Sequence, residues 1–213
     1  MLELFVSGNC SGYISSGLAA TMQSLGYSVC VYKPVEFNPV LQDGYLKSPD
    51  LSFAKKMDSN IKTYFSYLIE KQEDLENIDT DEIIKDFDSI RKEFECIIIC
   101  GSENLETNIT KNITEKDLIK TLEVPVLLVM DDIFQEACHK KLQKTLTYDI
   151  NLRGIFIPIL PNNEYIKQYS NTTILGITPK YDTNINPNDF IAEILTKTDI
   201  EKIFDVKIAK LEL

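Results

Sequence analysis

The chain has 213 residues, a formal charge of −11 at pH 7 and a hydrophobic fraction of 44%. These values exclude a disordered chain and suit one globular domain, residues 1–213, with a substantial core. The negative charge argues against a broad surface that follows nucleic-acid phosphates, but it is compatible with a small anion pocket made of backbone amides. No apolar run approaches the roughly 18 residues that a membrane-spanning helix needs, so no membrane partner is predicted.

The cysteine pattern favours reduced thiols in a cytoplasmic protein. Five cysteines are present without a Cys-x-x-Cys pair. The first residues include Glu3 and no basic segment, so no signal peptide is expected. The only histidine, His139, has one neighbouring thiol at Cys138 and no further spaced partners, so no zinc-type site is predicted.

Strand-like and helix-like segments alternate along the first half of the chain. The residues predict a strand over 2–7, a helix over 15–25 and a second strand over 28–32. Residues 33–78 are mixed, with short helical pieces. The next helix has an apolar stripe at helical spacing, and Asp79 followed by Glu82 is a plausible capping start.

The second half continues the alternation with shorter apolar runs. The predicted segments are a strand over 96–100, a strand over 124–130, a helix over 133–146, strands over 153–159 and 172–177, and mostly helix from 188 on. Continuously apolar strands are buried on both faces, and strands joined through helices form parallel sheets. We therefore predict a three-layer, doubly wound α/β fold with a mostly parallel sheet, whose ligand site lies beyond the carboxyl ends of the strands.

A turn with two glycines, Gly8 and Gly12, follows the first predicted strand. Two interpretations are open: the glycines permit a tight strand-to-helix turn, or the loop keeps backbone amides that attract an anion. A phosphate-binding loop would end in Gly-Lys followed by Ser or Thr, whereas this chain has Ile14, Ser15 and Ser16. Ser15 and Ser16 are also typical residues for a helix start.

Four stretches in the same order resemble dethiobiotin synthetase and its relatives, which include the amino-terminal domain of some long phosphotransacetylases. The stretches are "GYSVCVYKPV" at 26–35, "CIIICGSENLE" at 96–106, "VPVLLVMDDI" at 124–133 and "ILGITP" at 174–179. The resemblance covers nearly the whole chain. It implies a fold of the P-loop NTPase type, a homodimer, and an enzyme that uses ATP, Mg²⁺ and CO₂ to close a ureido ring on a diamine.

The family's phosphate-loop pattern falls on the glycine turn, with two differences. Gly8 and Gly12 match, and Ser16 keeps a hydroxyl where the family has a Mg²⁺-binding threonine. Ser15 replaces the lysine that neutralises phosphate charge, and a serine cannot supply that charge. Ile14 places a β-branched side chain where the backbone would approach the phosphates. The resemblance therefore implies a vestigial phosphate loop.

The other functional positions of the family also differ here. Cys100 falls on a metal-binding glutamate, and a thiol is a poor Mg²⁺ ligand. Asp50 corresponds loosely to another acidic metal position, although a helix cap is the more common role of such an aspartate. Pro158 falls on an asparagine that reads adenine. Lys33 matches the family's "KPV" lysine, and its alternatives are a catalytic or anion-binding role and a solvated surface lysine.

Four polar residues also have ordinary structural interpretations. Asp131 and Asp132 stand between a predicted strand and a predicted helix, where caps are expected. His139 is expected to be exposed and inert. Cys100 has no base nearby in sequence, so a nucleophilic role is not predicted.

These residues favour a fold that has lost catalysis and acts in binding, regulation or assembly. ATP and Mg²⁺, implied by the resemblance, are expected to bind weakly or not at all. The alternatives are a divergent ATP-dependent ligase and a sensor that holds a small anionic ligand without chemistry.

Overall fold

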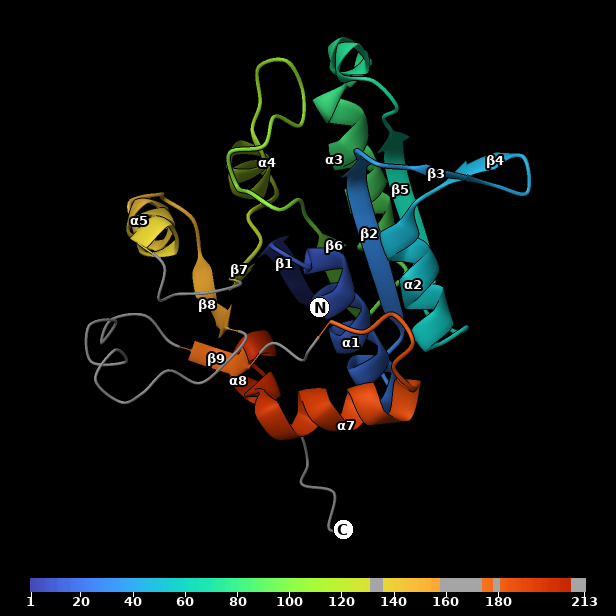
Figure 1. Ribbon diagram of the computed structural model, residues 1–213, viewed down its shortest axis with the longest axis vertical. Coiled ribbons are helices and arrows are strands. Elements are labelled where there is room, and N and C mark those ends of the chain that lie inside the picture. The colour runs from blue at the N-terminus through green and yellow to red at the C-terminus, as the bar shows by residue number, and fades with distance from the viewer. Residues whose placement is uncertain (131–135, 158–173, 178–180, 208–213) are drawn as a thin grey trace.

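The computed structural model describes residues 1–130, 136–157, 174–177 and 181–207 (Figure 1). Seven strands form one sheet in the order β5-β2-β6-β1-β7-β8-β9, and every neighbouring pair is parallel. The bounds are β1 (Leu2–Gly8), β2 (Val29–Glu36), β5 (Lys62–Leu68), β6 (Cys96–Cys100), β7 (Val126–Val129), β8 (Leu152–Ile157) and β9 (Ile174–Ile177). The predicted parallel α/β sheet is confirmed.

Helices cover both faces of the sheet and complete three layers (Figure 1). One face packs against α1 (Ser11–Ser24), α2 (Pro49–Met57), α7 (Pro187–Lys197) and α8 (Ile200–Phe204). The other packs against α3 (Thr80–Ile90), α4 (Glu115–Leu122) and α5 (Glu136–Thr145). A short 3-10 helix, η1 (Gln72–Asn77), and a hairpin of β3 (Val40–Gln42) and β4 (Tyr45–Lys47) complete the described elements. No helix in these ranges is long and apolar enough to cross a membrane.

The first helix begins earlier than the sequence predicts. It starts at Ser11 rather than at residue 15, and Ile14 N–H already donates a helical hydrogen bond to the Cys10 carbonyl at 3.0 Å. The chain reaches this helix through Gly8, whose φ of +115° favours glycine, and a Cβ there would lie 1.9 Å from the Val129 carbonyl oxygen. The segment in which the sequence predicts a loop is therefore the first helical turn.

Strand β5 lies within the segment that the sequence describes only as mixed. Its residues are all exposed or partly buried, because the strand forms an edge of the sheet. A half-exposed edge strand carries no continuous apolar run, and such a run was the signal for the other strands. The capping role of Asp79 at the start of α3 is confirmed, because its side chain accepts a hydrogen bond from Asp81 N–H at 2.9 Å.

Helices α1 and α7 pack closely through a glycine and an aromatic ring. A Cβ on Gly17 would lie 2.5 Å from the ring of Phe190, so a larger residue would separate the two helices. The ring of Phe190 is fully buried and stacks on Tyr13, with 4.4 Å between the ring centroids. This contact fixes the start of α1 against the carboxyl-terminal helices.

We expect Phe190→Ala to lower the free energy of unfolding by about 3–5 kcal/mol, because it leaves a cavity between α1 and α7. Urea unfolding measures the change. Leu195→Ala, on the same helix but 42% exposed, is the matched control and should cost under about 1 kcal/mol. Equal losses for the two variants would contradict this account of the packing.

Candidate functional site

A cavity of about 790 Å³ lies at the carboxyl ends of β1, β2 and β6. This is the edge of the sheet at which the sequence places the site. The lining comes from the start of α1, the segment after β2, the first turns of α2, the loop after β6, and residues 181–184. The predicted site residues Gly12, Lys33 and Asp50 all contribute to it.

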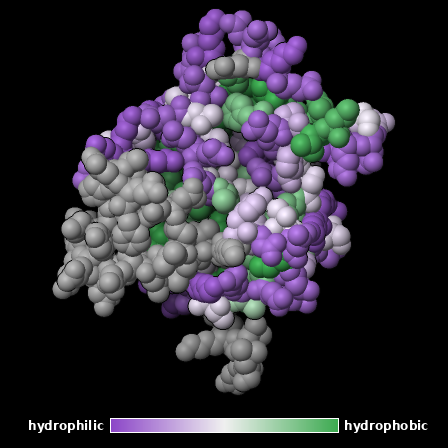
Figure 2. Space-filling model, viewed as in Figure 1, coloured by the Kyte–Doolittle hydropathy of each residue, from purple (hydrophilic) through white to green (hydrophobic). Residues whose placement is uncertain are grey.

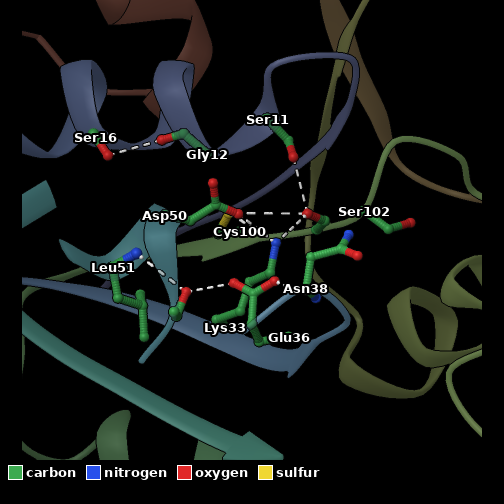
Figure 3. A network of polar contacts seen from close by, with 12 residues as sticks. Ser11, Gly12, Ser16, Lys33, Glu36, Asn38, Asp50, Leu51, Cys100 and Ser102 are labelled. Atoms are coloured by element: carbon green, nitrogen blue, oxygen red, sulfur yellow. Dashed lines mark hydrogen bonds and ion pairs between the residues drawn. The ribbon is translucent and has the colours of Figure 1, made fainter. Parts of the chain in front are cut away.

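Lys33 is the charged centre of the cavity (Figure 3). Its side chain is 6% exposed. The ammonium group lies 2.6 Å from Asp50 Oδ2, 3.0 Å from the Gly101 carbonyl oxygen and 3.5 Å from Cys100 Sγ. The interpretation of Lys33 as a solvated surface lysine is therefore wrong, because β2 extends to Glu36 and carries this residue into the interior.

The ammonium group of Lys33 stays charged. Burial alone would lower its pKa, but nearby acidic groups outweigh burial, and the net result is a pKa above the usual lysine value. Cys100 is a neutral thiol at neutral pH, because burial raises its pKa to about 12. The charge that favours protonated Lys33 at this pH is therefore that of the Asp50 and Glu36 carboxylates.

Asp50 does not cap α2. The N-cap is Ser48, whose hydroxyl oxygen accepts a hydrogen bond from Leu51 N–H at 3.3 Å and donates to Glu36 Oε2 at 2.5 Å. The interpretation of Asp50 as the cap is thus wrong by two positions. Asp50 instead stands in the first turn of α2 and directs its carboxylate at Lys33 (Figure 3).

Gly12 lets the Asp50 carboxylate approach α1. A Cβ at Gly12 would lie 1.9 Å from Asp50 Oδ1. Because Gly12 is in the first turn of α1, the carboxylate lies at the positive end of the helix dipole. A side chain of this protein therefore places negative charge beside the helix end at which the sequence predicts a phosphate.

The serines of this turn face the protein rather than a ligand. Ser16 is fully buried, and its hydroxyl donates to the Gly12 carbonyl at 2.8 Å within α1. Ser15 is buried beside Cys100. Ile14 is also fully buried, in the core, so the expectation that it crowds a phosphate loop is wrong: its backbone is helical.

The residues do not fit the Mg²⁺ site that the resemblance implies. Ser16 uses its hydroxyl in its own helix, and Asp50 pairs with Lys33. Cys100 presents a neutral thiol where the resemblance implies a carboxylate. Among the described residues, no group of three His, Cys, Asp or Glu side chains could hold a metal ion.

Glu115, at the start of α4, is a site-bordering residue that sequence reasoning missed. Its carboxylate is buried and accepts hydrogen bonds from the Ser7 hydroxyl and, at 2.5 Å, from Ser102 N–H. Burial raises its pKa. These bonds join the end of β1 to the loop after β6 and so fix the Gly101 carbonyl near Lys33. No sequence signal marks it, because a glutamate in the first turn of a helix is usually exposed.

Several predicted residues are not placed by the structure. Asp131, Asp132 and Pro158 lie outside the described ranges. His139 belongs to α5, but the structure describes only its backbone and not its side chain. The capping roles of the two aspartates and the inert role of His139 remain predictions.

Comparisons with known proteins agree on the family and the fold. A family model described as an AAA domain matches residues 12–188. The chain is 28% identical to the ATP-dependent dethiobiotin synthetase BioD of Methanococcus vannielii over 133 residues, which cover 59% of this chain and 63% of that protein. It is 22% identical to BioD of Bacillus licheniformis, with 96% of this chain and 97% of that protein covered.

Solved structures of other proteins share this architecture. A ParA family ATPase from Chlorobium tepidum TLS has a TM-score of 0.58 and 12% identity, with 97% of this chain and 93% of that one covered. The MinC:MinD cell division complex of Aquifex aeolicus contributes a chain with a TM-score of 0.53 and 11% identity, with 91% and 88% covered. At these identities the likeness shows the fold alone, which is of the P-loop NTPase type.

We expect Asp50→Asn to destabilise the protein more than Lys33→Met. The first change leaves a buried ammonium without its carboxylate, at about 2–4 kcal/mol. The second leaves a carboxylate that is one-third exposed and can be hydrated, at about 1–2 kcal/mol. Chemical denaturation measures both. Glu76→Gln breaks the exposed pair with Lys111 and should cost under about 1 kcal/mol. An Asp50→Asn loss no larger than that control would contradict the central role of the pair.

Thiol reactivity should separate the cysteines by burial. Burial raises the pKa of Cys96 and Cys100 to about 12 and raises the pKa of Cys30 further, whereas Cys10 is exposed. We expect iodoacetamide at pH 8 to modify Cys10 in the folded protein and the other three only after denaturation, because the thiolate is the nucleophile. Peptide mass spectrometry reads this out. Rapid native labelling of Cys100 would show that its thiolate is accessible and would reopen a nucleophilic role.

Proposed function

Because the chain belongs to the AAA-domain family whose model matches residues 12–188, we propose that it is a dethiobiotin-synthetase-like protein that binds a small ligand without ATP-dependent ligation. It would act in binding, regulation or assembly. One observation carries the proposal: the Asp50 carboxylate, which pairs with Lys33, lies against Gly12 in the first turn of α1.

The pair opposes phosphate binding in two ways. An anion at the start of α1 would be repelled by the negative charge of Asp50. It would also lose hydration of its own charge on entering the cavity, which costs free energy. Of the two lysines that line the cavity, Lys33 already has a carboxylate partner at 2.6 Å, and Lys56 donates a hydrogen bond to the Thr183 carbonyl at 2.6 Å. Ser15 cannot add the charge that a loop lysine would supply. A phosphate would therefore have to displace Asp50, and it would gain contact with Lys33 only by separating the existing ion pair.

The cavity still has the features of a small-molecule site. Three aromatic side chains line one wall of the cavity. Tyr13 stacks on Phe53 with 5.3 Å between the ring centroids, and its ring centroid lies 5.0 Å from that of Tyr181. The Lys33–Asp50 pair supplies polar groups near this apolar wall. A pocket with an apolar wall and few convergent polar groups is typical of ligand sites. An anionic ligand would reach Lys33 by replacing Asp50, whose side chain is 33% exposed and faces the cavity.

The competing function is a divergent ligase. It is favoured by the match to BioD of Bacillus licheniformis over 97% of that protein, whose name describes an ATP-dependent dethiobiotin synthetase. Lys33 inside the cavity is the catalytic candidate of this reading, as the family resemblance implies. The two functions differ in whether the chain turns over ATP and a diamine, so a direct assay separates them.

The test of the proposed function is the response to Mg-ATP. Absence of one charged phosphate contact costs about 1.5–3 kcal/mol, so a micromolar site would weaken by about 10- to 100-fold, and we expect competition from Asp50 to weaken it further, to about the millimolar range. Near its dissociation constant a ligand stabilises by only about 0.4 kcal/mol. We therefore expect about 2 mM Mg-ATP to raise the melting midpoint by no more than about 1–2 °C.

The assay for turnover uses the same protein with diamine, bicarbonate and Mg-ATP, and we expect no dethiobiotin above background. Ser16→Ala is the control, because in a working phosphate loop it would remove the metal-binding hydroxyl. A melting shift above about 5 °C, or turnover that Ser16→Ala abolishes, would replace this proposal with the ligase.

A further inference from the structure

Strand β5 leaves one edge of the sheet without a neighbouring strand. It pairs with β2 over Lys62–Leu68, and no backbone hydrogen bond from another described segment covers its outer side. Proteins normally protect such edges with proline, bulges or charges. Strand β5 contains no proline, its register with β2 shows no bulge, and its only charge is Lys62 at the first position. The backbone of β5 is therefore available for pairing with an added strand.

The segment that follows β5 in the chain is strongly acidic. Residues 70–88 contain nine acidic and two basic side chains, in a chain whose net charge is −11. Two of these carboxylates, on α3, lie along β5 itself. Asp86 accepts a hydrogen bond from the Ser66 hydroxyl at 2.5 Å. Glu82 accepts one from the Tyr67 hydroxyl. No described lysine or arginine forms an ion pair with either carboxylate, so both keep a negative charge that a partner could neutralise.

The other face of the sheet is apolar at this edge. Side chains alternate along a strand, so Phe65 points away from the face on which Ser66 meets α3. Phe65 is 48% exposed. The β3–β4 hairpin projects on the same side of the molecule as β5 (Figure 1). Its Val40, Leu41 and Tyr45 are 46%, 74% and 74% exposed, and Figure 2 shows hydrophobic surface on this arm. The edge therefore offers carboxylates on one face and exposed apolar side chains on the other.

We propose that the β5 edge binds an extended, basic segment of another protein, which adds to the sheet as a further strand. The side chains of such a strand alternate between the two faces of the sheet. Lysine or arginine at every second position would face Glu82 and Asp86, and the apolar residues between them would lie on the face of Phe65.

The charge of the edge distinguishes this partner from a second copy of the chain. If two β5 strands paired antiparallel, the two α3 helices would lie on the same face of one continuous sheet. The acidic side chains of one copy would then repel those of the other. A basic segment instead lowers the charge at the edge on binding, and attraction between unlike charges also speeds its association.

Binding of a synthetic peptide tests the edge. The probe is fluorescein-labelled TKVKVKT, which has the 7 residues of β5 and a lysine at every second position. We expect fluorescence anisotropy with the full chain to give a dissociation constant below about 100 μM at about 50 mM salt. The peptide TKKKVVT has the same composition without the alternation, and it should bind at least about tenfold more weakly.

N-methylation of the probe tests strand pairing, because it removes backbone donors and keeps the charges. Alternate N–H groups of a strand point to the same side. Of two probes methylated on the two alternate sets of residues, one should therefore lose binding at least about tenfold, and the other should keep it to within about threefold. Two methylated probes that bind equally well would show that no strand is added and would refute the proposal.

Two double variants of α3 test the carboxylates. Glu82→Gln with Asp86→Asn should weaken binding of TKVKVKT about tenfold, because both groups that face the added strand become neutral. Asp81→Asn with Asp88→Asn removes the same charge from another face of the same helix, and it should change binding less than about threefold. Thermal melts show whether each variant folds, and the comparison of TKVKVKT with TKKKVVT needs no variant.

Three further outcomes contradict the proposal. The first is that TKVKVKT shows no saturable binding. The second is an equal loss in both double variants, which would reduce the binding to general attraction between unlike charges. The third is self-association of the chain that excludes the probe, because the edge would then belong to a second copy.

Discussion

The ion pair between Lys33 and Asp50 is the constraint on which the rest of the site depends. Lys33 lies at 6% exposure, and a charge in that position needs a partner. Asp50 supplies it from the first turn of α2, and a glycine at position 12 is required for the carboxylate to fit against α1. Strand β2, α2 and α1 therefore meet around one pair of charges.

The same constraint orders the neighbouring loop. The Gly101 carbonyl completes the surroundings of the Lys33 ammonium and also accepts the Ser11 hydroxyl at 2.9 Å. Buried Glu115 keeps this loop in place through Ser7 and Ser102. The loop that follows β6 is consequently fixed by hydrogen bonds to side chains from β1, α1 and α4. The Lys33 ammonium and the Gly101 carbonyl are thus already hydrogen-bonded within the protein.

Family membership and internal pairing bear differently on function. The family match shows which proteins the chain is related to, and the structural likeness shows how its helices and strands are arranged. Whether a loop handles a nucleotide depends on a few charges and on the local backbone, which change without altering the fold. In this chain the glycines are kept, while the local backbone is helical and the charges neutralise each other. The proposed loss of ligation rests on those local features.

The sequence by itself determined the buried strands, the parallel sheet and the edge at which the cavity lies, because continuous apolar runs such as Cys96–Cys100 specify burial locally. It also indicated Lys33 and Asp50 as site residues. Only the tertiary structure decided that they pair, that α1 begins at Ser11 and that Glu115 is buried. These features depend on contacts between residues that are far apart in the chain, and local propensity carries no information about such contacts.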